Sequence, residues 1–511
     1  DRPRRGYTGT GSLWIDGVEL VRPRKMTEAL TVEVKDKRLG NVYEPGETVE
    51  LRASAPGEGV RWRVEDYQGG EIARGDASPV RFGLPEAGWY ACTLERLADG
   101  RVAEARVFRC AALPPADPRE RNAFVGVCSH FRGSAYPLET MDLMVRYGIT
   151  QIRDEISWSA VEKAQGELVL PDYGCAFTDY AARLGVEPLL IFDYANRFYD
   201  EGGFPISEPA VAGYARYAAT LAGWMAGKVD AFEVWNEYSI GCGMRGKTGE
   251  QTPETYARML VETYRRVKAV RPDATVVGIG GEHSQHHFDN IERMLEAGAA
   301  DAMDALSVHS YRYPRTPEAT DLVGEIRAVA ELARRHDARD RIWVTEIGWP
   351  THVGVRGVDE RTQARLIVRT LALLQATGVV QKVHWYDFKN DGLNREYNEH
   401  NFGVVWHQAF NYAPKPAAVA LAVFARMTAG GEAPRLWRDG DPRVVLYRLP
   451  DGRDLAIAWT TEGVRSLSLT GKGLEGYDLQ GNPLPQPLRP TATSDPTYFI
   501  GRGLQPSLAP E

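Results

Sequence analysis

From residue 123 onward, the chain alternates eight times between a short apolar segment and a helical segment. The apolar segments are expected to be strands at residues 123–129, 149–157, 187–194, 231–237, 274–280, 305–311, 342–348 and 379–388. They are apolar on both faces, which is typical of parallel strands that are covered by helices. This alternation therefore predicts a parallel sheet built from βα units.

The intervening segments show apolar residues at helical spacing, as Ile367, Leu371 and Leu374 do. Helices are expected at residues 138–147, 173–184, 211–226, 253–270, 288–299, 322–336, 360–376 and 416–427. Eight βα units over about 300 residues match the size of a closed (β/α)8 barrel, or TIM barrel. The competing architecture, a doubly wound open sheet, would want a Gly-rich phosphate turn after an early strand, and none is present. The predicted fold class is therefore α/β, with the barrel at residues 123–430.

The two ends of the chain have a different character. Residues 1–113 contain short alternating runs separated by Pro and Gly turns, which predicts an Ig-like β-sandwich. The Pro-rich residues 114–122 are expected to form a semi-rigid linker. Residues 431–511 return to β character, and we expect a C-terminal β domain that packs on the barrel. Its strand candidates at 443–447, 454–459 and 464–469 are typical of a meander.

Charge and composition exclude several classes of partner. A net charge of −8 gives no basic surface for nucleic acid, and apolar runs such as 417–425 are far too short to span a bilayer. The five cysteines are odd in number and scattered, which excludes a dense disulfide framework and structural zinc. Cys92 and Cys110 are expected either to meet across a hairpin or to remain buried free thiols.

The chain starts at Asp1 without a methionine or a leader segment. A removed signal peptide explains this start, and so does a trimmed sequence. We expect a secreted or periplasmic protein, with the cytoplasm kept as the alternative. We expect that no cofactor is required, and the sequence does not indicate an oligomeric state.

Barrel enzymes place their reactive side chains at the carboxyl ends of the strands. The fourth expected strand ends with Asn236 and Glu237, and the seventh ends at Glu346, so the two carboxylates lie almost opposite each other in an eight-strand ring. Retaining glycosidases need two carboxyls about 5–5.5 Å apart, whereas inverting ones need roughly 6.5–9.5 Å. The motifs favour the shorter separation, with Glu237 as general acid/base and Glu346 as nucleophile.

Other strand ends supply candidates for supporting roles. Arg153 is expected to hold Glu346 ionised, although a purely structural ion pair is the alternative, and Tyr311 is expected to orient Glu346. Asn236 is expected to bind a ring hydroxyl beside the reacting carbon. Further substrate-binding candidates are His130, Trp158, Asp193, Asn196, His309, Trp349, Trp385 and Asp387. Trp385 is the favoured sugar platform, while Trp158, Trp349 and His309 are also compatible with packing roles.

Three histidines follow the fifth strand, at positions 283, 286 and 287. They lack a partner carboxylate at motif spacing, so we expect a loop wall near the cleft rather than a metal site. Asp154 and Glu155 are rival carboxylates near the second strand.

Taken together, these motifs resemble the clan A glycoside hydrolases. Asn236-Glu237 on strand four, His309 and Tyr311 on six, Glu346 on seven and Trp385 on eight stand in that clan's order. The runs IRDEISW (152–158), VEKAQG (161–166), WYDFKND (385–391) and EHNFG (399–403) are similar to glycoside hydrolase family 39. The barrel resemblance covers residues 120–430, and the late β segment also resembles that group's accessory domain, whereas the N-terminal sandwich is outside the basic pattern.

This resemblance implies a retaining enzyme that cleaves a β-type glycosidic bond in an oligo- or polysaccharide. Family 39 includes β-xylosidases, α-L-iduronidases and enzymes acting on bacterial exopolysaccharide, so no single sugar is predicted. Three alternatives remain: a transglycosylase with the same mechanism, a non-catalytic glycan-binding barrel and a metal-dependent hydrolase.

Overall fold

The computed structural model describes residues 30–54, 59–117, 120–132, 136–243 and 251–508. The first 29 residues of the predicted sandwich, residues 118–119 of the predicted linker and the last three residues lie outside this description. Among the described helices, none is long and apolar enough to cross a bilayer.

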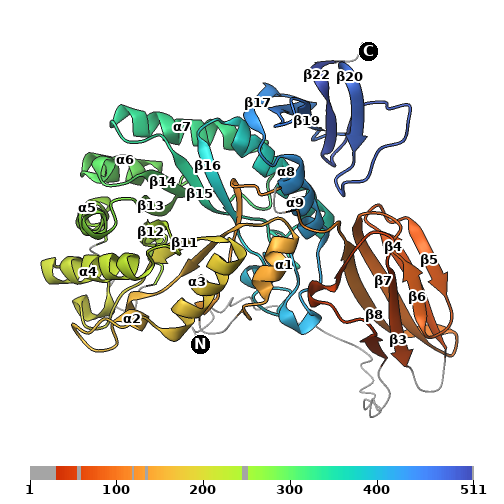
Figure 1. Ribbon diagram of the computed structural model, residues 1–511, viewed down its shortest axis with the longest axis horizontal. Coiled ribbons are helices and arrows are strands. Elements are labelled where there is room, and N and C mark those ends of the chain that lie inside the picture. Colours follow the sequence, from red (N-terminus) through yellow and green to blue (C-terminus); the bar gives the residue numbers. More distant parts are fainter. Residues whose placement is uncertain (1–29, 55–58, 118–119, 133–135, 244–250, 509–511) are drawn as a thin grey trace, which may run out of the picture.

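The centre of the molecule is a closed barrel of eight parallel strands (Figure 1). The strands are β9 (Val125–Cys128), β10 (Gln151–Glu155), β11 (Glu187–Phe192), β12 (Ala231–Val234), β13 (Thr275–His283), β14 (Ala305–His309), β15 (Ile342–Ile347) and β16 (Val380–Trp385). Each strand pairs in parallel with the next, and β16 closes the ring on β9. The predicted (β/α)8 barrel is therefore confirmed.

Helices surround this barrel. They are α1 (Thr140–Arg146), the short α2 (Trp158–Val161), α3 (Asp172–Leu184), α4 (Glu208–Trp224), α5 (Pro253–Val270), α6 (Phe288–Glu296), α7 (Leu322–Arg335), α8 (Glu360–Ala376) and α9 (Pro416–Met427). The start of α5 shows how local sequence sets a boundary: Pro253 suits the first helical turn, and Thr252 caps it by accepting a hydrogen bond from the Thr255 amide.

The N-terminal unit consists of two sheets, with strand orders β1-β3-β6 and β2-β8-β7-β4-β5. Their strands are β1 (Thr31–Val34), β2 (Val42–Tyr43), β3 (Thr48–Ser54), β4 (Val60–Asp66), β5 (Glu71–Gly75), β6 (Val80–Gly83), β7 (Gly88–Ala98) and β8 (Arg101–Ala112). Both sheets contribute side chains to one apolar cluster, for example Leu51 and Val64. Cys92 and Cys110, on the neighbouring strands β7 and β8, are free and buried thiols.

The C-terminal unit is one antiparallel sheet with the order β17-β18-β19-β22-β20-β21. Its strands are β17 (Glu432–Arg438), β18 (Arg443–Arg448), β19 (Asp454–Trp459), β20 (Arg465–Tyr477), β21 (Thr491–Ala492) and β22 (Thr497–Leu508). The predicted meander is wrong beyond β19, because β22 returns from the chain end to lie between β19 and β20.

Both flanking units pack beside the α8 and α9 side of the barrel (Figure 1). One face of the C-terminal sheet joins the barrel's apolar core through Ile457 and Trp459, so the prediction that this unit packs on the barrel is confirmed. Trp89 of β7 donates a hydrogen bond from its indole to the Pro414 carbonyl, at 2.9 Å.

Candidate active site

A cavity of about 520 Å³ lies at the carboxyl ends of the barrel strands. Six of the residues predicted from strand ends contribute to its wall: His130, Arg153, Asn236, Glu237, Tyr311 and Glu346. These residues come from five different strands or the turns that follow them, and only the closed barrel brings them together.

Strand register aligns three of the side chains that surround this cavity. His283 is the last residue of β13 and pairs with His309 of β14, and His309 in turn pairs with Glu346 of β15. The pairing of β13 with β14 shifts between Gly278 and Glu282, which carries His283 beyond the predicted end of its strand. Because of this irregularity, His283, which is expected on a loop wall, lies directly beside the catalytic candidates.

The backbone at Glu237 has an unusual conformation. Glu237 and Trp235 both adopt the left-handed conformation, with φ of 50° and 69°. Such conformations cost on the order of 1–3 kcal/mol each and persist only where the surroundings hold them. Here the Glu237 amide donates to the Gly280 carbonyl at 2.7 Å, and the Trp235 side chain is fully buried. The strain concentrates at the turn that aims the Glu237 carboxyl into the cavity.

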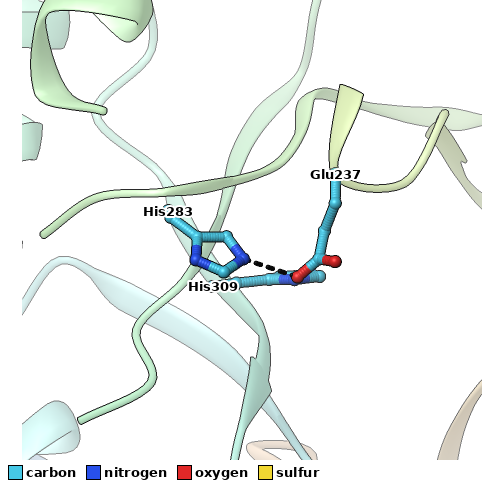
Figure 2. Close-up of side chains that lie close together, drawn as sticks. All are labelled: Glu237, His283 and His309. Carbon is cyan, nitrogen blue, oxygen red and sulfur yellow. Dashed lines mark hydrogen bonds and ion pairs between the residues drawn. The ribbon is translucent and has the colours of Figure 1, made fainter. Parts of the chain in front are cut away.

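The Glu237 carboxyl is contacted by two imidazoles (Figure 2). Its Oε1 lies 2.6 Å from Nε2 of His283 and 2.8 Å from Nδ1 of His309. The Cys242 thiol donates to Oε2 at 3.1 Å. Burial disfavours the charged carboxylate, but hydrogen bonds from His283 and His309 outweigh this and hold the pKa of Glu237 well below its ordinary value.

The pKa of His283 shifts in the opposite direction to that of Glu237. Burial lowers the pKa of this imidazole, but the hydrogen bond to Glu237 and the negative charge of that carboxylate outweigh burial and raise it. Glu237 and His283 therefore behave as one unit that shares a proton.

Glu346 has different partners. Arg153 donates from Nη1 to Oε1 at 2.6 Å, and the Tyr311 hydroxyl donates to Oε2 at 2.7 Å. Arg153 is itself buried and is fixed by Glu233, at 2.6 Å, and by the side-chain oxygen of Asn236, at 2.7 Å. These contacts hold the Glu346 carboxylate in one orientation and stabilise its negative charge.

His309 contacts both carboxyls and thereby limits the distance between them. Its Nδ1 lies 2.8 Å from Oε1 of Glu237 and 3.5 Å from Oε2 of Glu346. The separation of these two oxygens therefore cannot exceed the sum of the two distances. That limit on one pair of oxygens is compatible with the roughly 5–5.5 Å that separates the carboxyls of retaining glycosidases.

Several predicted sugar contacts lie elsewhere. Trp385 and Trp349 are fully buried and stack on each other with ring centroids 5.6 Å apart. Trp158 is buried as well, stacks on Tyr199 and donates from its indole to Glu162 at 2.6 Å. In the described structure none of these three tryptophans lines the catalytic cavity. The prediction of Trp385 as a sugar platform is corrected, because its ring faces the core.

Two predicted hydroxyl ligands are also buried away from the cavity wall. Asp193 is fully buried, and burial together with neighbouring Glu155 raises its pKa well above the ordinary value. Asp387 is buried beneath His130, whose Nε2 lies 3.2 Å away. Burial lowers the pKa of His130, but Asp387 and Asp391 outweigh burial and raise it to about 10. Asp387 therefore supports His130 instead of reaching into the cavity.

Residues that sequence reasoning did not assign to the site supply much of the cavity wall. Aromatic side chains line it at Tyr194, Tyr313, Tyr386, Tyr397 and Phe402. Glu399 lines it as well, and it belongs to the EHNFG run that carries the family resemblance. Tyr386 directly follows Trp385, and neighbouring residues near a strand end point in opposite directions. That alternation is the signal that could have found Tyr386.

A second cavity, of about 750 Å³, adjoins the first. Tyr194 lines both cavities, and Gly243 on the wall of the second directly follows Cys242 on the wall of the first. Asn196 lies in the second cavity rather than in the catalytic one, and its amide donates to the Glu162 carbonyl at 2.9 Å. Lys163 and Arg197 also line this second cavity.

Two groups of side chains at this end of the barrel have the composition of a metal site. One consists of Glu237, His283 and His309, and the other of His130, Asp387 and Asp391. Within each group, one ligand atom from each residue lies within 4.8 Å of the others. The other two histidines after the fifth strand lie outside these groups: His286 is exposed, and His287 contacts Glu282 at 2.5 Å.

Comparisons with known proteins show that the chain is similar to glycoside hydrolases. A family model described as a glycosyl hydrolase catalytic core matches residues 239–403, a stretch that contains Glu346 and begins just after Glu237. No curated protein matches the chain. A family 39 glycoside hydrolase from the gut symbiont Bacteroides cellulosilyticus WH2 has 25% sequence identity and a TM-score of 0.76, covering 92% of this chain and 100% of that one. This likeness extends beyond the barrel into the flanking units.

More distant structures share the fold. A family 39 β-xylosidase from Caulobacter crescentus has 15% identity and a TM-score of 0.54, covering 76% of this chain and 97% of that one. The catalytic domain of a family 30 xylanase C from Talaromyces cellulolyticus has 12% identity and a TM-score of 0.51, covering 74% and 97%. The chain thus has the fold of the family 39 and family 30 glycoside hydrolases of clan A, and its resemblance to family 39 is confirmed.

Proposed function

We propose that this protein is a retaining glycoside hydrolase that cleaves a β-type glycosidic bond in an oligo- or polysaccharide. The observation that carries the proposal is the shared contact of Glu237 and Glu346 with Nδ1 of His309. This contact supports the proposal because it brings the two carboxyls close together, as attack by one carboxylate and proton donation by the other require.

In the first step, a carboxylate oxygen of Glu346 attacks the anomeric carbon while the bond to the leaving oxygen breaks. Glu237 gives its proton to that oxygen, and the sugar remains as an ester of Glu346. In the second step, Glu237 takes a proton from water, the water oxygen attacks the anomeric carbon, and Glu346 leaves as a carboxylate. Arg153 and Tyr311 stabilise Glu346 whenever it is free.

The acid must hold a proton when the leaving oxygen departs, although its pKa is held low in the structure. The pair formed by Glu237 and His283 resolves this conflict, because the pair retains a proton that the carboxyl alone would release. When a substrate covers the cavity and excludes water, the proton passes to Glu237 and then to the glycosidic oxygen.

The second cavity supports a substrate longer than one sugar. Tyr194 forms a wall that both cavities share, and its hydroxyl accepts a hydrogen bond from the side chain of Asn236 at 3.0 Å. A sugar stacked on Tyr194 would therefore lie next to the residue that precedes the acid/base. Lys163 and Arg197 offer hydrogen-bond donors to such a second unit.

A mass-spectrometric product screen tests the proposal. The wild type and a Glu346→Gln variant are each incubated with aryl glycosides, plant glycans and bacterial exopolysaccharides. Products from the wild type alone, with the anomeric configuration retained by NMR, would support it. Added acceptor sugar separates transglycosylation from hydrolysis, and a chelator that abolishes activity would reveal a metal-dependent hydrolase. Glycan binding without products would favour the non-catalytic barrel.

A further inference from the structure

We propose that Glu237, His283 and His309 also form a binding site for a divalent transition-metal ion, best matched by Zn²⁺, whose occupancy blocks hydrolysis. The binding stands on the geometry of these three side chains alone. The inhibition rests on the proposed function of Glu237 as acid/base.

The three side chains converge from three neighbouring parts of the barrel (Figure 2). Glu237 follows β12, His283 ends β13 and His309 ends β14. Their ligand atoms are two imidazole nitrogens and one carboxylate oxygen, all within 4.8 Å of one another. Zn²⁺ binds such nitrogen and oxygen ligands at about 2.0–2.2 Å, and catalytic zinc sites use three protein ligands of this type.

The arrangement leaves an open coordination position. Glu237 and His283 line the catalytic cavity, so an ion reaches them from solvent, while His309 lies buried next to them. The ion would enter between the two imidazoles, where Oε1 of Glu237 now accepts their hydrogen bonds. The carboxyl would withdraw from that position by a side-chain rotation and bind the ion in turn. Water from the cavity completes a tetrahedral set.

The second group with metal-binding composition is a poorer match. It offers one imidazole and two carboxylates, and softer transition ions prefer the site with more nitrogen ligands. Asp391 is already paired with Lys389, whose Nζ lies 3.3 Å away, and Asp387 accepts a hydrogen bond from the Tyr136 hydroxyl at 3.3 Å. The Glu237 group is therefore the better match for the ion.

His309 sets the expected strength of binding. A ligating Nδ1 requires the proton to sit on Nε2, and this buried atom has no hydrogen-bond partner among the described residues. Strong zinc sites give that second nitrogen an acceptor, and its loss typically lowers affinity by about 10–100-fold. We therefore expect reversible binding with a micromolar dissociation constant, as suits an inhibitory ion rather than a resident cofactor.

Occupancy of this site would stop both chemical steps. A carboxylate that ligates Zn²⁺ can neither give a proton to the leaving oxygen nor accept one from water. Glu346 keeps its contacts with Arg153 and Tyr311, so the nucleophile itself is intact. Aryl glycosides with very good leaving groups should still form the ester with Glu346 in the presence of the ion.

Titration calorimetry with Zn²⁺ alone, on the full-length chain, tests the binding. We expect one site in the wild type and at least a tenfold loss of affinity in His283→Gln and in Glu237→Gln. His286→Gln, a change of an exposed histidine three residues along, should bind as the wild type does, and so should His130→Gln, which disables the other group. Thermal melts check that each variant is folded.

Wild-type affinity in His283→Gln and Glu237→Gln, or no binding in the wild type, would overturn the proposal. Loss of binding in His130→Gln alone would transfer the site to the other group and overturn it as well. Inhibition is then measured with the substrate found in the product screen: Zn²⁺ should inhibit the wild type and His286→Gln, and a chelator should restore both. Binding without inhibition would retain the metal site and remove its regulatory role, whereas a failed product screen leaves the calorimetric result standing by itself.

Discussion

Two chemically identical carboxyls, Glu237 and Glu346, face the same cavity in contrasting surroundings. Glu346 is held by the permanent charge of Arg153 and by the Tyr311 hydroxyl. Glu237 is held by His283, His309 and the Cys242 thiol, and an imidazole is the side chain whose charge ordinarily changes nearest to neutral pH. Partners of fixed charge suit a carboxyl that must stay ionised, whereas partners that can exchange a proton suit one that must gain and lose a proton in each cycle.

Replacing the proposed nucleophile should have the largest effect. Glu346→Gln removes the carboxylate that we propose forms the covalent ester, so we expect a loss of kcat/KM of about 10⁴-fold or more. The loss should be similar for good and poor leaving groups, because no other described carboxyl contacts both Arg153 and Tyr311. Steady-state kinetics on a series of aryl glycosides measure this. Retention of wild-type turnover in this variant would remove Glu346 from the mechanism.

Replacing the proposed acid/base, unlike replacing Glu346, should reduce activity by an amount that depends on the leaving group of the substrate. Glu237→Gln removes proton donation, a contribution of roughly 10²–10⁴-fold. The loss should be largest for poor leaving groups and small for the bond-breaking step of a dinitrophenyl glycoside, which departs without a proton. Burst kinetics on both kinds of substrate distinguish the steps. An equal loss for every leaving group would contradict the division of roles between the two residues.

A smaller change tests the fixed surroundings of Glu346. Tyr311→Phe deletes the 2.7 Å hydrogen bond to Oε2 and keeps the ring, so we expect kcat to fall by about 10–100-fold with little dependence on the leaving group. Tyr313→Phe is a matched control, since Tyr313 also lines the cavity but makes no described hydrogen bond to either catalytic carboxyl. If both variants lose the same activity, the contact with Oε2 has no special importance.

The fold was almost entirely readable from the sequence because its signals are local. The bounds of α5, α8 and α9 agree with the predicted helices, since capping residues and apolar spacing lie within the segments themselves. The C-terminal sheet shows the limit of such signals. The position of β22 between β19 and β20 depends on pairing between distant segments, which no local sequence pattern predicts.

The candidate site likewise contains residues that the sequence predicts and residues that it does not. Strand-end logic found Glu237, Glu346, Arg153 and Tyr311, because a barrel gathers the ends of all its strands at one place. It assigned the aromatic contact to Trp385, where a difference of one residue decides between the core and the cavity. It also missed the contact of His283 with Glu237, which depends on the irregular pairing of β13 with β14.

The finest test concerns the exchangeable partner of Glu237. The pKa of Glu237 is lowered and that of His283 is raised, so the pair holds one proton from below the usual carboxyl range to above the usual imidazole range. Activity should fall at high pH as His283 gives up that proton. In His283→Gln only the carboxyl can hold it, so the alkaline limb of kcat/KM should move to lower pH, with a modest loss at the optimum.

The acid limb gives the internal control for this test, because the contact of Glu346 with Arg153 is unchanged in the variant. His286→Gln, on the exposed part of the same turn, should keep the wild-type profile on both limbs. A profile of His283→Gln that is lowered uniformly, with neither limb displaced, would mean that the imidazole only positions Glu237. The two carboxyls would then differ in the geometry of their contacts and not in their exchange of protons.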